Sequence, residues 1–202
     1  MHIIQKTEIS PGHGDLVKVF IGDSLLKMVI QGGAPPMDPN KRLDCFVAPG
    51  AKLKDMEEML RHVIRYYASI NVSVNQLRII VALGYNDHNS YDGAIGDFER
   101  CVAGTNLKLA FVPPPVPREK KLLMQQTEYV RVLEGHKKLV DVLINFNNTN
   151  GVRFNCDLYR TSVKTRSKSH FASDNYHFSA EKSNHILQHI RKVFSRNDVF
   201  YV

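Results

Sequence analysis

The sequence predicts an α/β fold, a three-layer α/β/α sandwich around a central, mostly parallel five-stranded sheet. Short apolar runs alternate along the chain with longer segments whose apolar residues recur at helical spacing. Residues 77–83 are almost continuously apolar and include β-branched side chains, as is typical of a strand buried on both faces of a parallel sheet. Strands that alternate with helices imply right-handed crossovers, which place helices over the faces of the sheet.

Five apolar runs that end at turn-forming residues are the predicted strands. They cover residues 16–21, 43–48, 77–83, 107–112 and 152–158. The first run ends at a Gly-Asp-Ser turn, the second at Pro-Gly and the third at Gly84. The prolines of residues 113–117 close the fourth run, because proline cannot donate a hydrogen bond to a β-ladder. In a parallel sheet, function gathers at the carboxyl ends of the strands, where such turns lie.

Apolar residues spaced three and four apart predict helices between and after these runs. The helices are expected over residues 25–30, 52–68, 92–102, 119–146 and 180–194. Glycines and prolines in residues 31–40 stop the first helix, and Gly135 is a weak point within the fourth. Residues 1–14 carry a Pro-Gly turn and are expected to be a lead-in segment. Because the sequence has no internal repeat and no low-complexity linker, residues 1–202 are interpreted as a single domain.

Composition narrows the class of protein. The chain has 202 residues, enough to bury a full core, and 43% of its residues are hydrophobic. No apolar run reaches the roughly 18 residues of a membrane span, and the first residues lack the apolar stretch of a secretory signal. Three widely spaced cysteines without a Cys-x-x-Cys pair argue against a disulfide framework and against a zinc site. We therefore expect an intracellular, cytoplasmic protein.

Positive charge is concentrated in one part of the sequence. The formal net charge is +7, and its densest local cluster is the polar loop 160–173, which contains Lys164, Arg166 and Lys168. A basic surface attracts the phosphates of nucleic acids, so these three side chains are candidate RNA contacts. The plainer alternative is a solvated loop, since a positive balance by itself mainly reports solubility.

Ser24 is the candidate nucleophile. It follows the first strand and begins an apolar segment with helical spacing. Its hydroxyl is therefore expected at the carboxyl edge of the sheet and its amide at the positive end of a helix. Both positions suit a residue that attacks a carbonyl carbon and then stabilises an oxyanion. The alternative is that Asp23 or Ser24 is only an N-cap, a role that both residue types often fill.

Four segments, taken together, resemble the sequence blocks of the SGNH, or GDSL-type, hydrolase superfamily. Residues 22–25 (Gly-Asp-Ser-Leu) are similar to its first block and Gly50 to its second. Residues 84–87 (Gly-Tyr-Asn-Asp) resemble its third block, and residues 174–177 (Asp-Asn-Tyr-His) its last. The blocks occur in family order, and the resemblance covers about residues 16–195. It implies a flavodoxin-like hydrolase fold and a serine esterase that works without a cofactor.

The residue types in these blocks suit acyl transfer. A serine hydroxyl is a weak nucleophile until a base takes its proton, and His177 is suited to that task near neutral pH. Asp174, three residues earlier, is expected to fix the imidazole tautomer that faces the serine. The backbone amides of Ser24 and Gly50 and the side-chain amide of Asn86 are the expected oxyanion donors.

Two further carboxylates in these blocks, Asp23 and Asp87, are expected to brace the turns by accepting backbone hydrogen bonds. Each site residue also has a plainer interpretation: His177 at a helix entry, Asn86 with Asp87 as ordinary turn residues, and Asp174 likewise. We favour the functional interpretation, because the plainer ones would all have to hold together and in family order.

The expected substrate is a small-molecule or lipid ester: a short acyl ester, an acetyl ester or a lipid. Within the superfamily the chain looks most like the esterase domains encoded in some eukaryotic retrotransposons, on residues 48–51 (Ala-Pro-Gly-Ala) and 84–87. An alternative function is an RNA-binding module on the same fold with weak or no hydrolase activity, which is similar to the Oskar-type branch that lacks the triad. A third is a degenerate scaffold for protein contacts, in which Ser24 and His177 lie too far apart to hydrogen-bond.

Overall fold

A computed structural model describes residues 1–7, 16–26, 43–117 and 125–151, and six single positions between 179 and 191. The strand expected over residues 152–158 lies outside the described residues, as does most of the helix expected over residues 180–194. The five described positions of that helix, from Glu181 to Arg191, are helical.

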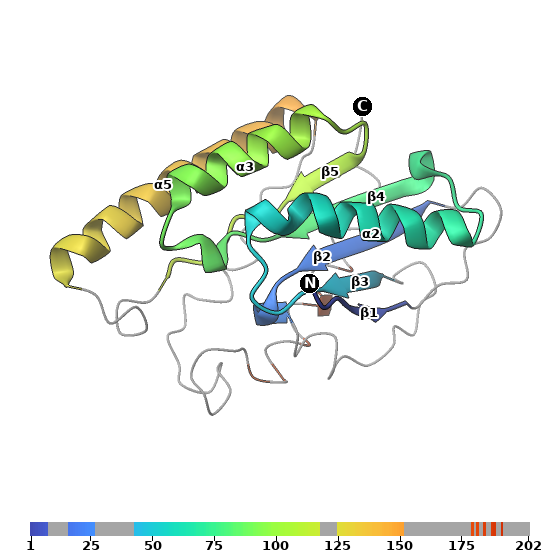
Figure 1. The fold of residues 1–202 in the computed structure, drawn as a ribbon, viewed down its shortest axis with the longest axis horizontal. Helices are drawn as coiled ribbons and strands as arrows, with labels where there is room; N and C mark the ends of the chain where they lie inside the picture. Colours follow the sequence, from blue (N-terminus) through green and yellow to red (C-terminus); the bar gives the residue numbers. More distant parts are fainter. Residues whose placement is uncertain are drawn as a thin grey trace.

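The described strands form one five-stranded sheet in the order β1-β3-β2-β4-β5 (Figure 1). They are β1 (Ile4–Lys6), β2 (Val17–Gly22), β3 (Asp44–Val47), β4 (Leu77–Ala82) and β5 (Lys108–Phe111). β2 pairs in parallel with β3 and with β4, and β4 pairs in parallel with β5. β1 is antiparallel to β3, with Ile4 opposite Val47. The predicted α/β class with a mostly parallel five-stranded sheet is confirmed.

The edge strand β1 lies within the segment expected to be a lead-in. Its three residues pair with Cys45, Phe46 and Val47 of β3. The flanking Pro-Gly turn and the shortness of the run hide the strand in the sequence. Such a short strand depends on its partner strand for hydrogen bonds, so its own sequence pattern carries little signal.

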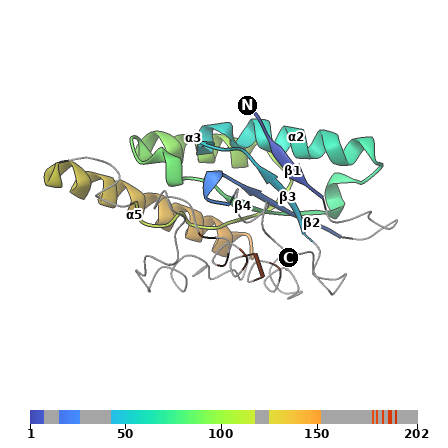
Figure 2. The same ribbon diagram turned by 90° about the horizontal axis from the view of Figure 1, so that it is seen from below.

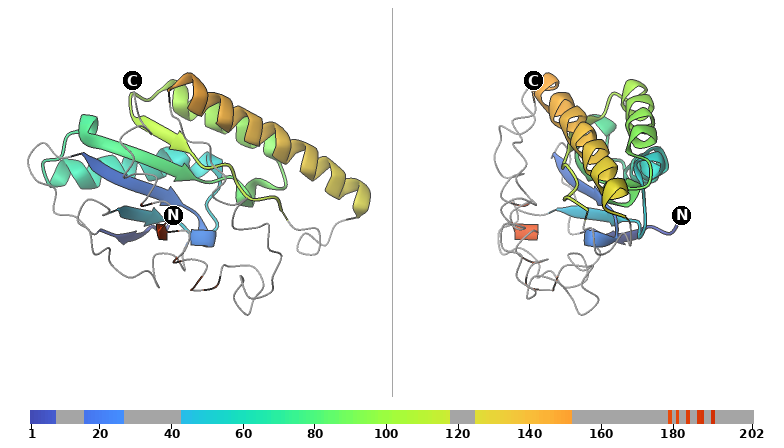
Figure 3. Two further views of the ribbon diagram at one scale, coloured as in Figure 1. Left: turned by 180° about the vertical axis from the view of Figure 1, so that it is seen from behind. Right: turned by 90° about the vertical axis from the view of Figure 1, so that its left-hand side faces the viewer.

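Three helices among the described residues accompany the sheet: α2 (Met56–Ser69), α3 (Tyr91–Ala103) and α5 (Gln126–Thr149). α2 and α3 cover one face of the sheet (Figures 1 and 2). α5 runs beside α3 at the β5 edge, as the two views of Figure 3 show. Residues 118–124, with which the fourth helix was expected to begin, lie outside the described residues.

Apolar side chains on both faces of the sheet are buried. Val19 and Ile21 of β2 belong to the main core and are fully buried, and so is Ile79 of β4. On the opposite face of these two strands, Phe20 and Ile80 are also buried. Alternate residues of a strand point to opposite faces, so both faces of the sheet are covered, as the sandwich interpretation requires.

The inward face of α2 consists of residues at helical spacing: Met56, Met59, Leu60, Val63 and Tyr67. The phenol of Tyr67 crosses the core and donates a hydrogen bond to Asp44 of β3, whose carboxylate is fully buried. A buried carboxylate is costly unless it is hydrogen-bonded, so Tyr67 helps to stabilise α2 on the sheet.

Two contacts fix α5 in place. Gly135 lies against the ring of Tyr91, where an added Cβ would come within 3.0 Å of Tyr91 Cβ, so glycine allows α5 and α3 to approach closely. Asn147, which is 1% exposed, bonds β5, the last strand of the sheet in the part of the chain that is described. Phe111 N donates to Asn147 Oδ1 at 2.9 Å, and Asn147 Nδ2 donates to Phe111 O at 2.8 Å. The amide thus satisfies both backbone groups of Phe111.

Among the described helices, none combines the length and the apolar character needed to cross a membrane. Cys45 is buried and Cys101 half-buried. Cys156 lies outside the described residues.

Candidate active site

The first turn of the site follows β2. Asp23 and Ser24 come directly after the strand, and the short 3-10 helix η1 (Ser24–Leu26) begins at the serine. Leu25 N donates to Asp23 Oδ1 at 2.9 Å, which closes the turn with the side chain of the aspartate. Ser24 is 8% exposed. The candidate nucleophile therefore lies at the carboxyl end of a central strand, in a turn shaped by Asp23.

The second turn follows β3 and lies against the first. Ala48 N donates to Gly22 O at 3.0 Å, and Ala51 N donates to Ala48 O at 3.0 Å, so residues 48–51 form a tight turn beside the end of β2. Gly50 has φ +76, a left-handed backbone conformation that glycine adopts without strain. It is exposed, and a Cβ added there would meet nothing within 4 Å. Its backbone is open to an approaching ligand.

The third turn follows β4. Gly84 has φ +110, and a Cβ added there would be 3.1 Å from Leu139 Cδ2 and 3.2 Å from Pro114 Cγ. Both the backbone conformation and the close packing therefore require glycine. The 3-10 helix η5 (Tyr85–Asp87) follows, and Asp87 Oδ2 accepts a hydrogen bond from Leu53 N at 3.0 Å. This bond holds the third turn to the segment that leads into α2.

Asn86 joins the three turns. Its Nδ2 donates to Ala51 O at 3.0 Å and to Asp23 Oδ2 at 3.3 Å. Asp23 adjoins Ser24, and Ala51 adjoins Gly50. One side-chain amide thus connects three segments that are separate in the sequence and that carry Ser24, Gly50 and Asn86. The structure brings these three residues together at one edge of the sheet.

Burial changes the acid–base properties of the two aspartates. Burial, together with the nearby Asp87 carboxylate, raises the pKa of Asp23 to about 7, against the opposing effect of the hydrogen bond from Leu25 N. Burial also raises the pKa of Asp87, against the hydrogen bond from Leu53 N. Both carboxylates accept backbone hydrogen bonds, and Asp23 takes up a proton close to neutral pH.

Asp174 and His177 lie outside the described residues, so their roles beside Ser24 stay predictions. The candidate RNA contacts Lys164, Arg166 and Lys168 lie outside them as well. The described residues contain as many acidic as basic side chains. The net charge of +7 therefore arises in the remaining segments.

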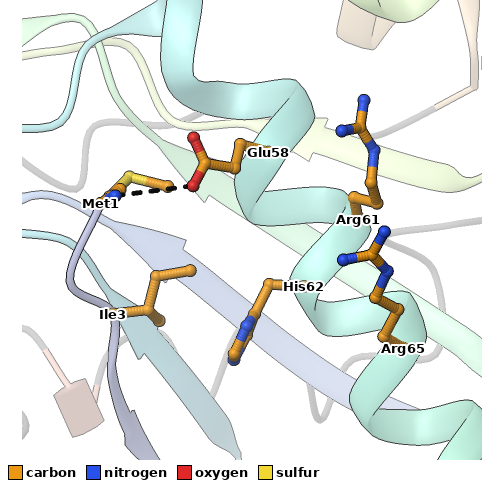
Figure 4. Close-up of a pocket in the computed structure, with 6 residues that line it drawn as sticks. All are labelled: Met1, Ile3, Glu58, Arg61, His62 and Arg65. Atoms are coloured by element: carbon orange, nitrogen blue, oxygen red, sulfur yellow. Dashed lines mark ion pairs between the residues drawn. The ribbon is translucent and has the colours of Figure 1, made fainter.

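A cavity of about 470 Å³ adjoins the third turn, between residues 88–92 and the first half of α5. Arg131 lines the cavity from α5 and was not among the residues predicted for the site. The sequence alone does not indicate this position of Arg131, because α5 begins well after the third turn and only the fold brings the two together. A second cavity, of about 350 Å³, lies between β1 and the middle of α2 (Figure 4). Its lining contains no residue of the three turns.

Histidine, cysteine and acidic side chains of the described segments form no group of three that could hold a metal ion.

Comparison with known proteins identifies the fold. No protein-family model matches the sequence, and no curated protein matches it. A lipase/acylhydrolase from Enterococcus faecalis is similar in structure, with a TM-score of 0.51 at 14% identity, over 93% of this chain and 100% of that one. A lipase, Lip_vut3, from a goat rumen metagenome has a TM-score of 0.55 at 12% identity, over 88% of this chain and 97% of that one. The chain shares the fold of these lipases and acylhydrolases.

Proposed function

We propose that this chain is a serine esterase of the SGNH type that acts through an acyl-enzyme on Ser24. The observation that supports the proposal is the position of Asn86, whose amide connects the turns of Ser24 and Gly50. A nucleophile and several amide donors at one edge of a sheet are what acyl transfer requires. The shared fold with lipases and acylhydrolases supports the same class of reaction.

In the first half of the reaction, His177 takes the proton of Ser24 Oγ as this oxygen attacks the carbonyl carbon of an ester. Asp174 holds the imidazole in the required tautomer. The resulting oxyanion accepts hydrogen bonds from the amides of Ser24 and Gly50 and from Asn86 Nδ2. His177 then gives its proton to the departing alcohol, and the acyl group remains on Ser24.

In the second half, His177 takes a proton from water as the water oxygen attacks the acyl carbon. The same donors stabilise the second oxyanion, and its collapse releases the carboxylic acid and returns the proton to Ser24 Oγ. For Asn86, the longer bond to Asp23 Oδ2, at 3.3 Å, is the one that exchanges with the oxyanion, while the 3.0 Å bond to Ala51 O keeps the amide in place.

The substrate of this proposal is a short acyl or acetyl ester or a lipid ester. The similarity of residues 48–51 and 84–87 to retrotransposon-encoded esterase domains supports an origin in that group. No organic cofactor and no metal take part in the steps above.

Hydrolysis of p-nitrophenyl acetate by the wild type, by Ser24→Ala and by Ser69→Ala tests the proposal. Ser69 is an exposed serine at the C-terminal end of α2, belongs to none of the three turns and serves as the matched control. We expect turnover in the wild type and in Ser69→Ala and none in Ser24→Ala. Equal turnover in Ser24→Ala, or no turnover by the folded wild type, contradicts the proposal.

The pH dependence tests the histidine base. We expect kcat/KM to fall as the pH drops from about 8 to about 5, because protonated His177 cannot accept the serine proton. Asp23, with a pKa of about 7, titrates in the same range, so the profile is also measured for Asp23→Asn. If the pH profile of kcat/KM has the same midpoint in Asp23→Asn as in the wild type, the fall is due to the histidine. A wild-type kcat/KM that does not change with pH contradicts a histidine base.

RNA binding is a second candidate function, favoured by the distribution of charge. The described residues are balanced in charge, so the excess of +7 belongs to the remaining segments, which include Lys164, Arg166 and Lys168. Binding through these side chains weakens steeply with salt, in proportion to the phosphates that they neutralise. A fluorescent RNA titrated across a salt series, with the wild type and the triple alanine variant, tests this. Binding that ignores both salt and the three substitutions contradicts it.

A further inference from the structure

The cavity adjoins the third turn, which carries Asn86. His88 lines the cavity and follows Asn86 by two residues, which places their Cα atoms no more than about 7 Å apart. Asn86 in turn bonds Asp23, the neighbour of Ser24, at 3.3 Å. The cavity and the turn that carries Ser24 are therefore linked through Asn86. The volume of about 470 Å³ lies within the range of small-molecule sites, about 300–1,000 Å³.

The walls of the cavity are polar. Asn89 and Ser90 contribute an amide and a hydroxyl from the turn, and Glu128 and Arg131 contribute charged groups from α5. Neither Glu128 nor Arg131 has an ion-pair partner among the described residues. Both are exposed, so their charged groups can turn toward a ligand.

His88 adds a further polar group at the side nearest Asn86. Its Nδ1 lies 3.2 Å from Tyr85 O, and since a carbonyl can only accept, Nδ1 carries the hydrogen. In the neutral ring, Nε2 is then an acceptor. The apolar part of the lining is small and consists of Val132, Gly135 and Tyr91, of which Val132 and Tyr91 are buried.

We propose that this cavity binds the alcohol part of the ester and that this alcohol is a polyhydroxylated, uncharged group such as a sugar; the proposal rests on the proposed esterase function. Hydroxyl groups both donate and accept, and the walls offer donors and acceptors in a mixture that suits them. A fatty acyl chain would leave the charged and amide groups without partners. An anionic ligand is disfavoured, because the lining contains one arginine and two carboxylates, those of Glu128 and Asp92.

The test compares two acetate esters that differ only in the chemistry of the alcohol. In 6-O-acetylglucose the alcohol carries several hydroxyls, whereas cyclohexylmethyl acetate has a ring of similar size without them. We expect the wild type to have a higher kcat/KM for the sugar ester, because a site built to bind hydroxyls rejects an analogue that lacks them. In Arg131→Met and in Glu128→Gln, we expect the ratio of kcat/KM for the sugar ester to kcat/KM for the cyclohexylmethyl ester to fall by about tenfold or more. This is the effect typical of losing one hydrogen bond to a charged group.

Arg65→Met is the matched control, since Arg65 is an exposed arginine of the other cavity, on α2 (Figure 4). It leaves the ratio unchanged. A wild type without preference for the sugar ester overturns the inference, and so does a ratio that Arg131→Met and Glu128→Gln do not alter. p-Nitrophenyl acetate, measured in parallel, separates the two proposals. Hydrolysis of p-nitrophenyl acetate without a preference for the sugar ester refutes only the proposal that the cavity binds a sugar. Inactivity on all three esters refutes the proposed esterase function.

Discussion

Replacing Asn86 by alanine removes the group that connects the three turns. Its Nδ2 donates to Ala51 O at 3.0 Å and to Asp23 Oδ2 at 3.3 Å. Ala51 is 3% exposed and Asp23 2%, so water has little access to replace the lost donor. A buried acceptor without its donor costs about 1–3 kcal/mol, so the two together predict a loss of about 2–6 kcal/mol in the free energy of unfolding. In a chain of this size Tm falls by about 2–4 °C per kcal/mol.

The same substitution has a second, larger effect on the reaction. If Asn86 Nδ2 binds the oxyanion, its removal lowers kcat by about 10²–10³-fold, the loss typical of one oxyanion donor. The loss of stability alone does not produce this, provided that the assay temperature is well below the lowered Tm. The two effects are measured separately, by thermal unfolding and by initial rates on p-nitrophenyl acetate with equal amounts of folded protein.

Asn147→Ala is the matched control for this experiment. Asn147 is also a buried asparagine whose amide makes two hydrogen bonds, to Phe111 N and Phe111 O at 2.9 Å and 2.8 Å. Its removal leaves two buried backbone groups unpaired, so we expect a comparable loss of about 2–6 kcal/mol in the free energy of unfolding. Because Asn147 lies at the β5 edge and contacts none of the three turns, kcat per folded molecule stays at the wild-type value. Equal kcat values for Asn86→Ala and Asn147→Ala would refute the role of Asn86 as an oxyanion donor.

Two further predictions concern the turns. Burial raises the pKa of Asp23 from 3.8 to about 7, so the folded state keeps a proton that the unfolded state releases. The free energy of unfolding therefore falls as pH rises from about 4 to about 7, by up to roughly 1.4 kcal/mol per pH unit. In Asp23→Asn, urea unfolding lacks the part of this fall that Asp23 causes. An identical pH dependence of the two proteins contradicts the prediction. Gly84→Ala forces a Cβ to 3.1 Å from Leu139 and 3.2 Å from Pro114 at φ +110. We expect Gly84→Ala to lower the free energy of unfolding, measured in urea, by about 2–4 kcal/mol and to lower kcat by shifting Asn86. A wild-type free energy of unfolding together with a wild-type kcat would refute this.

The central strands were predictable because their sequences carry the signal by themselves. β2 and β4 have apolar residues on both faces, and each ends at a glycine-containing turn. β1 was not predictable, because three residues contain too little pattern and the strand is defined by its pairing with β3. Gly135 reads as a weak point of a helix, yet α5 continues through it because the glycine packs on Tyr91.

The members of the site were predictable from residue types, but their connections were not. Ser24, Gly50 and Asn86 follow strands that end at one edge, so topology alone places them near one another. The bond from Asn86 to Asp23 spans 63 positions and depends on side-chain rotamers, about which the sequence is silent. The role of Arg131 at the cavity likewise depends on how α5 lies beside α3.

The measurement that tests the central claim most directly is detection of the acyl-enzyme. The wild type is mixed with p-nitrophenyl acetate and quenched in acid within the first turnovers, and its peptides are examined by mass spectrometry. We predict one acetyl group on the peptide that contains Ser24, with fragmentation placing it on Ser24 and with no such product in Ser24→Ala. Continued hydrolysis with the acetyl group on another residue, or with no acetylated peptide in a quench fast enough to trap the intermediate, would contradict the claim that Ser24 is the nucleophile.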